Sequence, residues 1–141
     1  GNADAVTESA RNGFGIFMRH GCAECHKLDN RLFTDHDFHN TGVEQGAADL
    51  GRFEATGEEV DRYRFRTPSL RNVALTSPYM HDGSENSLAD VVRFYMRGPA
   101  SSKSGIVINA GVDERLLPFV LDETEVSELI DFLKSLTSKN E

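Results

Sequence analysis

Hydrophobic residues recur at helical spacing near both ends of the chain. The first series predicts a helix that leads directly into a cysteine-containing segment, and it consists of Val6, Ala10, Phe14, Phe17 and Met18. Near the other end, Asp122 and Glu125 have the spacing of a capping box, which marks the start of a helix. The apolar stripe of that helix is Val126, Leu129, Ile130, Leu133 and Leu136.

A third helix is predicted from Ser87 to Arg97. Ser87 is a suitable N-cap, and Gly98-Pro99 supplies a stop signal. Positions i, i+3, i+4 and i+7 carry an apolar stripe of Leu88, Val91, Val92 and Tyr95. This pattern places Tyr95 on the buried face, and Met96 is rotated from it by about 100°.

The rest of the chain, above all residues 27–65, carries little periodicity and predicts long loops. The length of 141 residues suits a single domain, so we expect residues 1–141 to form one all-α domain. Only 38% of the residues are hydrophobic. A small helical shell of this composition needs a large apolar group at its centre to be well stabilised.

The charge of the chain excludes some classes of partner. Lys and Arg number 15 against 23 Asp and Glu, which gives a net charge of −8. This balance argues against nucleic-acid binding, which relies on clustered basic residues. No apolar run approaches the ~20 residues that a membrane-spanning helix needs.

The two cysteines carry the strongest chemical signal, because both lie in the motif Cys22-Ala-Glu-Cys25-His26. A zinc site would need two further ligands, and no second cysteine pair exists. A thioredoxin-type motif would lie in a βαβ unit, and no such pattern surrounds this one. C-x-x-C-H is the spacing of covalent c-type haem attachment. We therefore predict that Cys22 and Cys25 hold one haem c and that His26 is its proximal iron ligand.

Covalent haem attachment in bacteria takes place outside the cytoplasm, so we expect a periplasmic or otherwise exported protein. The first residues, Gly1-Asn2-Ala3-Asp4, have neither the basic nor the apolar region of an export signal. We expect such a signal to have been removed already.

Further motifs follow in order from residue 13 onward. They are Gly15-Ile16-Phe17, the cysteine motif, Phe38-His39-Asn40-Thr41-Gly42, Gly51-Arg52-Phe53, the run from Phe65 to Thr76, and Pro78-Tyr79-Met80-His81-Asp82-Gly83. Together they resemble the C-terminal haem domain of the bacterial dihaem cytochrome c peroxidase and MauG family. The resemblance implies an all-α, cytochrome c-type domain with long loops around one covalently attached haem c.

The resemblance also implies that two haem domains have different roles. In the family, the N-terminal haem meets hydrogen peroxide, and the C-terminal haem receives electrons or stores an oxidising equivalent. This chain has one attachment motif, so we expect an electron-transfer or charge-storage domain or subunit. Its partner would be another haem domain, a subunit or a small redox protein. The alternative is a haem peroxidase active in its own right, and the sequence leaves enzyme activity open.

Three residues are candidates for the sixth iron ligand: Met80, Tyr95 and Met96. A Met thioether favours ferrous iron, whereas a Tyr phenolate favours ferric iron and can stabilise high-valent iron. By resemblance, the peroxidases carry Met in the alignment column of Tyr95, and the MauG-like branch carries Tyr. We favour Tyr95. The alternatives are either Met and an open or differently liganded sixth site, and core packing is the other role for all three residues.

Other candidate residues would surround the haem. Arg66 or Arg71 would bind a haem propionate, because the guanidinium matches a carboxylate with two parallel hydrogen bonds. Solvent exposure is the alternative for each. By resemblance, His81 lies close to the haem and to the route between two haems, and a structural hydrogen bond is its alternative role.

Two further groups of residues are candidate metal sites. His36 and His39, next to Asp35 and Asp37, are the residue types of a metal cluster, but the resemblance gives this loop no metal role. By resemblance, the carbonyls at 76 and 78 (Thr and Pro) help to hold an interdomain calcium ion. Calcium prefers several oxygen ligands, so we expect that site only if a partner domain completes it.

Overall fold

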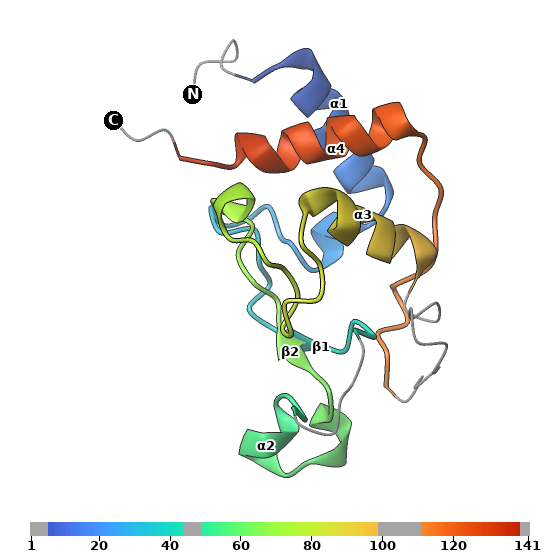
Figure 1. Ribbon diagram of the computed structural model, residues 1–141. Coiled ribbons are helices and arrows are strands. Elements are labelled where there is room, and N and C mark those ends of the chain that lie inside the picture. The colour runs from blue at the N-terminus through green and yellow to red at the C-terminus, as the bar shows by residue number, and fades with distance from the viewer. Residues whose placement is uncertain (1–5, 44–48, 99–110, 139–141) are drawn as a thin grey trace.

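The computed structural model describes residues 6–43, 49–98 and 111–138. Residues 1–5, which bear on the expected export signal, and Pro99 of the predicted stop lie outside these ranges. The helices are α1 (Glu8–Arg19), α2 (Phe53–Thr56), α3 (Leu88–Arg97) and α4 (Glu123–Ser135). Single 3₁₀ turns lie at Cys22–Glu24, Glu59–Asp61 and Val73–Leu75. Figure 1 shows α1 and α4 crossing at one end of the molecule, with α3 beneath them and α2 at the opposite end.

α3 and α4 start where the sequence predicts, because their caps are local. The Asp122 side chain accepts from the Glu125 amide and the Glu125 side chain accepts from the Asp122 amide, which completes the predicted capping box. Ser87 accepts from the Asp90 amide at the start of α3, and Gly98 follows its end with a φ of +74°. The predicted stripe of α4 is buried at Val126, Leu129 and Leu133, together with Phe132, which the stripe did not include.

The buried face of α1 differs from the predicted one. It consists of Ala10, Gly13, Ile16 and Phe17, whereas the side chains of Phe14 and Met18 are 40% and 45% exposed. The reason is the close crossing with α4. A Cβ on Gly13 would overlap the backbone carbonyl oxygen of Glu128. The small residues of α1 therefore face α4, and part of the bulky apolar set stays at the surface.

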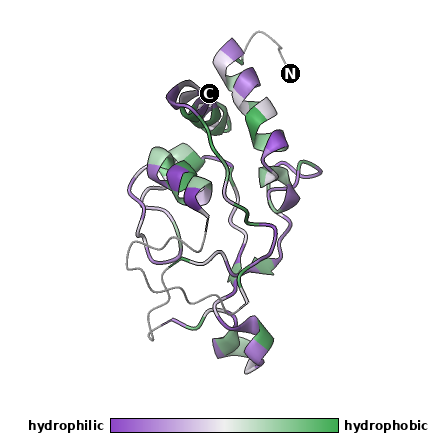
Figure 2. Cartoon of the chain, turned by 90° about the vertical axis from the view of Figure 1, so that its right-hand side faces the viewer, coloured by the Kyte–Doolittle hydropathy of each residue, from purple (hydrophilic) through white to green (hydrophobic). Residues whose placement is uncertain are grey.

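α3 also turns a different face to the core. Leu88 and Val92 are buried, and Met96, one turn further, packs against the same core cluster. Tyr95 lies on the neighbouring side of the helix and is half-buried. The predicted stripe was therefore wrong at its end, because the face that packs against the core continues from Val92 to Met96. Figure 2 shows that each helix carries both hydrophilic and hydrophobic positions, as such one-sided packing requires.

The long loops contain a small sheet that the all-α prediction did not include. β1 (Phe38–His39) and β2 (Phe65–Arg66) pair antiparallel, with Phe38 opposite Arg66 and His39 opposite Phe65. The fold is nevertheless dominated by helices. In the described ranges, no helix combines the length and the apolar character needed to cross a membrane.

Candidate functional site

The cysteine motif occupies a tight turn directly after α1. Gly21 has a φ of +73°, a conformation that favours glycine, and it leads into the 3₁₀ turn that begins at Cys22. The His26 amide donates to the Cys22 carbonyl at 3.0 Å, which folds the imidazole back beside the two cysteines. The turn therefore gathers both thiols and the imidazole at the end of α1.

The environment of the cysteines is unlike that of a redox-active pair. Burial raises the pKa of the Cys22 thiol to about 11, and burial also raises the pKa of Cys25. A reactive C-x-x-C pair has a lowered thiol pKa. Cys22 also packs against the apolar core. These thiols are suited to apolar surroundings, as the edge of a macrocycle would provide.

The His26 side chain is oriented as an iron ligand requires. Its Nδ1 lies 2.9 Å from the Phe33 carbonyl oxygen, so Nδ1–H donates and the lone pair of Nε2 stays available. Burial lowers the pKa of His26, which keeps the imidazole neutral at physiological pH. A neutral imidazole with a hydrogen-bonded second nitrogen fits a haem iron, and the two adjacent thiols fit covalent attachment.

Of the three candidates for the sixth ligand, Tyr95 lies beside the cysteines. Burial, together with the nearby Cys25 and Cys22, raises the pKa of its hydroxyl to about 12. No residue in the described ranges hydrogen-bonds this hydroxyl, and its ring meets Phe94 edge-on. Met96 instead packs on the core, and its carbonyl accepts from the Phe119 amide. Met80 lies in a turn with a φ of +68°.

Arg66, Arg71 and His81 each have a different partner in the structure. Arg66 is exposed, and its Nη2 lies 3.2 Å from Nδ1 of His36. Arg71 donates to the Ser138 hydroxyl at 2.9 Å. His81 is exposed and stacks on the Phe65 ring at 3.7 Å between centroids.

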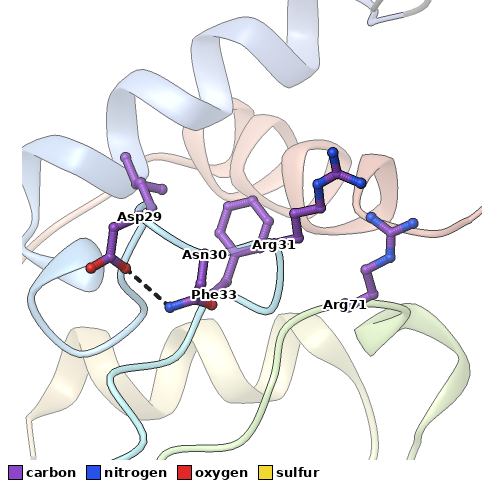
Figure 3. Close-up of a pocket in the computed structure, with 6 residues that line it drawn as sticks. Asp29, Asn30, Arg31, Phe33 and Arg71 are labelled. Atoms are coloured by element: carbon purple, nitrogen blue, oxygen red, sulfur yellow. Dashed lines mark hydrogen bonds between the residues drawn. The ribbon is translucent and has the colours of Figure 1, made fainter.

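A pocket of about 290 Å³ lies next to Arg71. Figure 3 shows the guanidinium groups of Arg71 and Arg31 on one side of it, and Asn30 donating to Asp29 on the other. Its lining residues are Leu28, Asp29, Asn30, Arg31, Phe33 and Arg71. Cys22, Cys25 and His26 do not line it, so we do not assign it to the haem.

A network of charged side chains lies beside Cys25, and the sequence predicts only part of it. The imidazole of His39 lies between two carboxylates, with Nε2 2.8 Å from Asp35 and Nδ1 2.9 Å from Asp113. Arg115 binds both oxygens of Asp113, at 2.6 and 2.9 Å. Sequence reasoning singled out Asp35 and His39 but missed Asp113 and Arg115, which lie more than 70 residues further along the chain.

The predicted grouping of His36 with His39 is not what the structure brings together. His36 turns to Arg66, and Cys25 joins Asp35 and His39 instead, with ligand atoms within 4.8 Å of one another. Because both ring nitrogens of His39 lie within hydrogen-bonding distance of carboxylates, hydrogen bonds account for this cluster without a metal.

The network predicts a pH-dependent contribution to stability. Arg115 holds the pKa of the Asp113 carboxyl well below its usual range. The stabilisation is therefore complete above the unfolded pKa of about 3.9 and is lost as the pH falls below it. We expect Asp113→Asn to lower the free energy of unfolding by about 1–3 kcal/mol at neutral pH, with a smaller loss below about pH 4.

Urea unfolding of both proteins across this pH range measures the difference. Asp37→Asn is the control, because Asp37 is exposed and its carboxylate accepts from the Phe38 amide. A difference that stays constant as the pH falls would contradict the assignment.

The likeness to known proteins extends over almost the whole chain. No protein-family model matches it. It is 36% identical over 142 residues to the methylamine utilization protein MauG of Methylorubrum extorquens, covering 99% of this chain and 37% of that protein. With cytochrome c peroxidase Ccp of Escherichia coli it is 34% identical over 143 residues, covering 96% of this chain and 27% of that one.

Solved structures of proteins of this kind superpose on almost the whole chain. A MauG-like protein associated with microbial copper homeostasis superposes with a TM-score of 0.84 at 31% identity, over 95% of this chain and 45% of that one. A variant of the dihaem peroxidase BthA from Burkholderia thailandensis superposes with a TM-score of 0.78 at 25% identity, over 94% of this chain and 42% of that one. The chain therefore spans less than half the length of these relatives.

The helical fold and the geometry at His26, together with these likenesses, define a haem domain of the cytochrome c peroxidase class. More particularly, the chain belongs to the family of MauG and the bacterial dihaem cytochrome c peroxidases, and it corresponds to their C-terminal haem domain.

Proposed function

We propose that this chain holds one covalent haem c and serves a dihaem system as the domain that transfers electrons or stores an oxidising equivalent. The observation that carries the proposal is the turn in which His26, bound to the Phe33 carbonyl, follows Cys22 and Cys25. A bound haem supplies one-electron iron chemistry. The residues of the chain would attach it, orient the imidazole and exclude water from one side.

Tyr95 is the sixth ligand in this proposal. Its hydroxyl lies on the side of α3 that faces the cysteines, whereas the Met96 side chain packs against the core. A phenolate ligand favours ferric iron and therefore suits storage of an oxidising equivalent. Because burial raises the pKa of Tyr95, its hydroxyl keeps its proton when no iron is bound, and a bound ferric iron would be needed to displace that proton.

We expect the ferric protein to lack the near-infrared band of Met–haem ligation, and Tyr95→Phe to change its visible spectrum. Absorption spectroscopy of the ferric haem protein measures both. Tyr79→Phe is the matched control, because the Tyr79 hydroxyl donates to the Val73 carbonyl instead. A near-infrared Met band that persists in Tyr95→Phe would refute the tyrosine ligand.

Peroxide turnover by this chain alone has less support. It would need an acid–base group free to act over the iron. The ring nitrogens of His39 are bound to carboxylates, His81 is stacked on Phe65, and Asp82 is exposed and accepts from the Ser84 amide. A reversible one-electron titration with slow peroxide consumption is the expected result. Rapid peroxide turnover by the purified chain would overturn it.

The surroundings of the domain are part of the proposal. We infer an exported, periplasmic protein and a partner that is another haem domain, a subunit or a small redox protein. Arg66 and Arg71 remain candidates for the haem propionates, and each would have to turn from its present partner, His36 or Ser138. His81 remains a candidate for contact with the haem. A calcium ion would bind only if a partner domain supplied further ligands.

A further inference from the structure

The four side chains Asp35, His39, Asp113 and Arg115, here called the His39 network, form a cluster beside the haem-attachment motif. The side chains of His39 and the two aspartates are only 13–14% exposed, whereas that of Arg115 is 39% exposed. With a neutral imidazole, the formal charge of the network is −1, and with a protonated imidazole it is zero. The network is thus one proton short of neutrality.

The hydrogen-bonding geometry suits both protonation states of His39. Nε2 lies 2.8 Å from the Asp35 carboxylate, so Nε2–H is the donor to Asp35 in either state. Nδ1 lies near one hydrogen-bond acceptor and one donor. The acceptor is the Asp113 carboxylate at 2.9 Å, and the donor is Nη2 of Arg115 at 3.1 Å. A protonated Nδ1 donates to Asp113, and an unprotonated Nδ1 accepts from Arg115. One proton can therefore be gained or lost without displacing heavy atoms.

The His39 network lies close enough to Cys25 for its charges to act on the attachment motif. Ligand atoms of Asp35 and His39 lie within 4.8 Å of Cys25 Sγ. Burial is the main cause of the raised pKa of Cys25, and the charges of Arg115, Asp35 and Asp113 also act at this thiol.

On the sheet side, His39 pairs with the uncharged Phe65, and the neighbouring Arg66 is bound to His36. Among the residues that the structure describes, the charged groups that face His39 are therefore those of its own network and of the motif from Glu24 to His26.

We propose that Nδ1 of His39 is a redox-linked proton site of this domain. The inference rests on the proposed function, because it needs a haem that changes charge. An electron that enters from an external donor makes the haem site more negative. One proton from solvent water then binds at Nδ1, with the exposed Arg115 marking the side open to water, and oxidation releases both. A domain that exchanges electrons in this way limits the change in its net charge.

The midpoint potential of the haem-loaded protein, measured against pH by spectroelectrochemistry, tests this proposal. Reduction raises the proton affinity of a nearby imidazole, so the potential should fall with rising pH over one window in which a single proton is exchanged. His39→Gln should flatten this window. His36→Gln, an exposed histidine in the same loop, should keep it.

Two further variants keep the test decisive if His39→Gln fails to fold. Asp113→Asn removes the acceptor of Nδ1–H and should move the window to lower pH. Arg115→Gln removes a competing cation and should move it to higher pH. A window that persists in His39→Gln, a wild-type potential that does not vary with pH, or shifts in the same direction for these two variants would overturn the inference alone. A protein without a reversible haem titration would overturn the proposed function itself.

Discussion

Replacing both Cys22 and Cys25 by serine is expected to abolish covalent haem attachment. The thiols of these residues are the groups that add to the two vinyl groups, and a serine hydroxyl does not replace them. They are also the only two cysteines of the chain, so no other thiol can substitute. The effect should be all-or-none when the protein is produced with a bacterial c-type cytochrome maturation system.

Haem staining after denaturing electrophoresis measures this effect, because only covalently bound haem survives denaturation. Ala23→Ser is the matched control, since it introduces serine between the two cysteines and leaves both thiols in place. It should stain as strongly as the wild type. Staining of the double serine variant would show that the haem, if bound, is attached elsewhere.

Gly13→Ala is expected to destabilise the fold more than any other single methyl group added to α1. Its Cβ would overlap the Glu128 carbonyl oxygen, and it would also press on the Phe132 Cβ at 2.9 Å. A backbone carbonyl inside α4 cannot rotate away, so the two helices must separate. Overpacking of this kind costs about 1–3 kcal/mol of stability, and we expect the upper end or beyond.

Gly15→Ala provides the matched control in the same helix. A Cβ on Gly15 meets nothing within 4 Å, and alanine favours a helix over glycine by about 1 kcal/mol. Denaturant unfolding of the two variants should therefore give shifts of opposite sign. Equal shifts would contradict the close crossing of α1 and α4.

The parts of the fold that the sequence predicts well are those with local signals. The cap at Asp122 and the cap at Ser87 each need only three following residues, and both are where the sequence predicts them. The position of His26 beside the cysteines likewise follows from one short motif.

The errors arise where distant segments decide the outcome. The face of α1 depends on how closely α4 approaches Gly13, and no periodicity rule records that approach. The face of α3 that contacts the core runs through Met96, so Tyr95 is left on the side of the cysteines. The predicted stripe was therefore wrong at its end, and the role of Tyr95 as sixth ligand, which the family resemblance favours, stays a prediction.

The candidate site shows the same limit. Asp113 and Arg115 reach Cys25 only because their segment folds back onto β1, where the Asp113 amide donates to the Asn40 carbonyl. Arg66 and Arg71 flank a short motif in the sequence, yet they bind different partners in the structure. A single sequence contains no direct record of such long-range pairs.

The central claim is that this chain carries one covalently attached haem through Cys22 and Cys25. Intact-mass spectrometry of the denatured, purified protein tests it most directly. The account predicts the mass of the polypeptide plus one haem, with the added mass located on the peptide that contains the C-x-x-C-H motif. A polypeptide mass without haem, from cells that mature other c-type cytochromes normally, would contradict it.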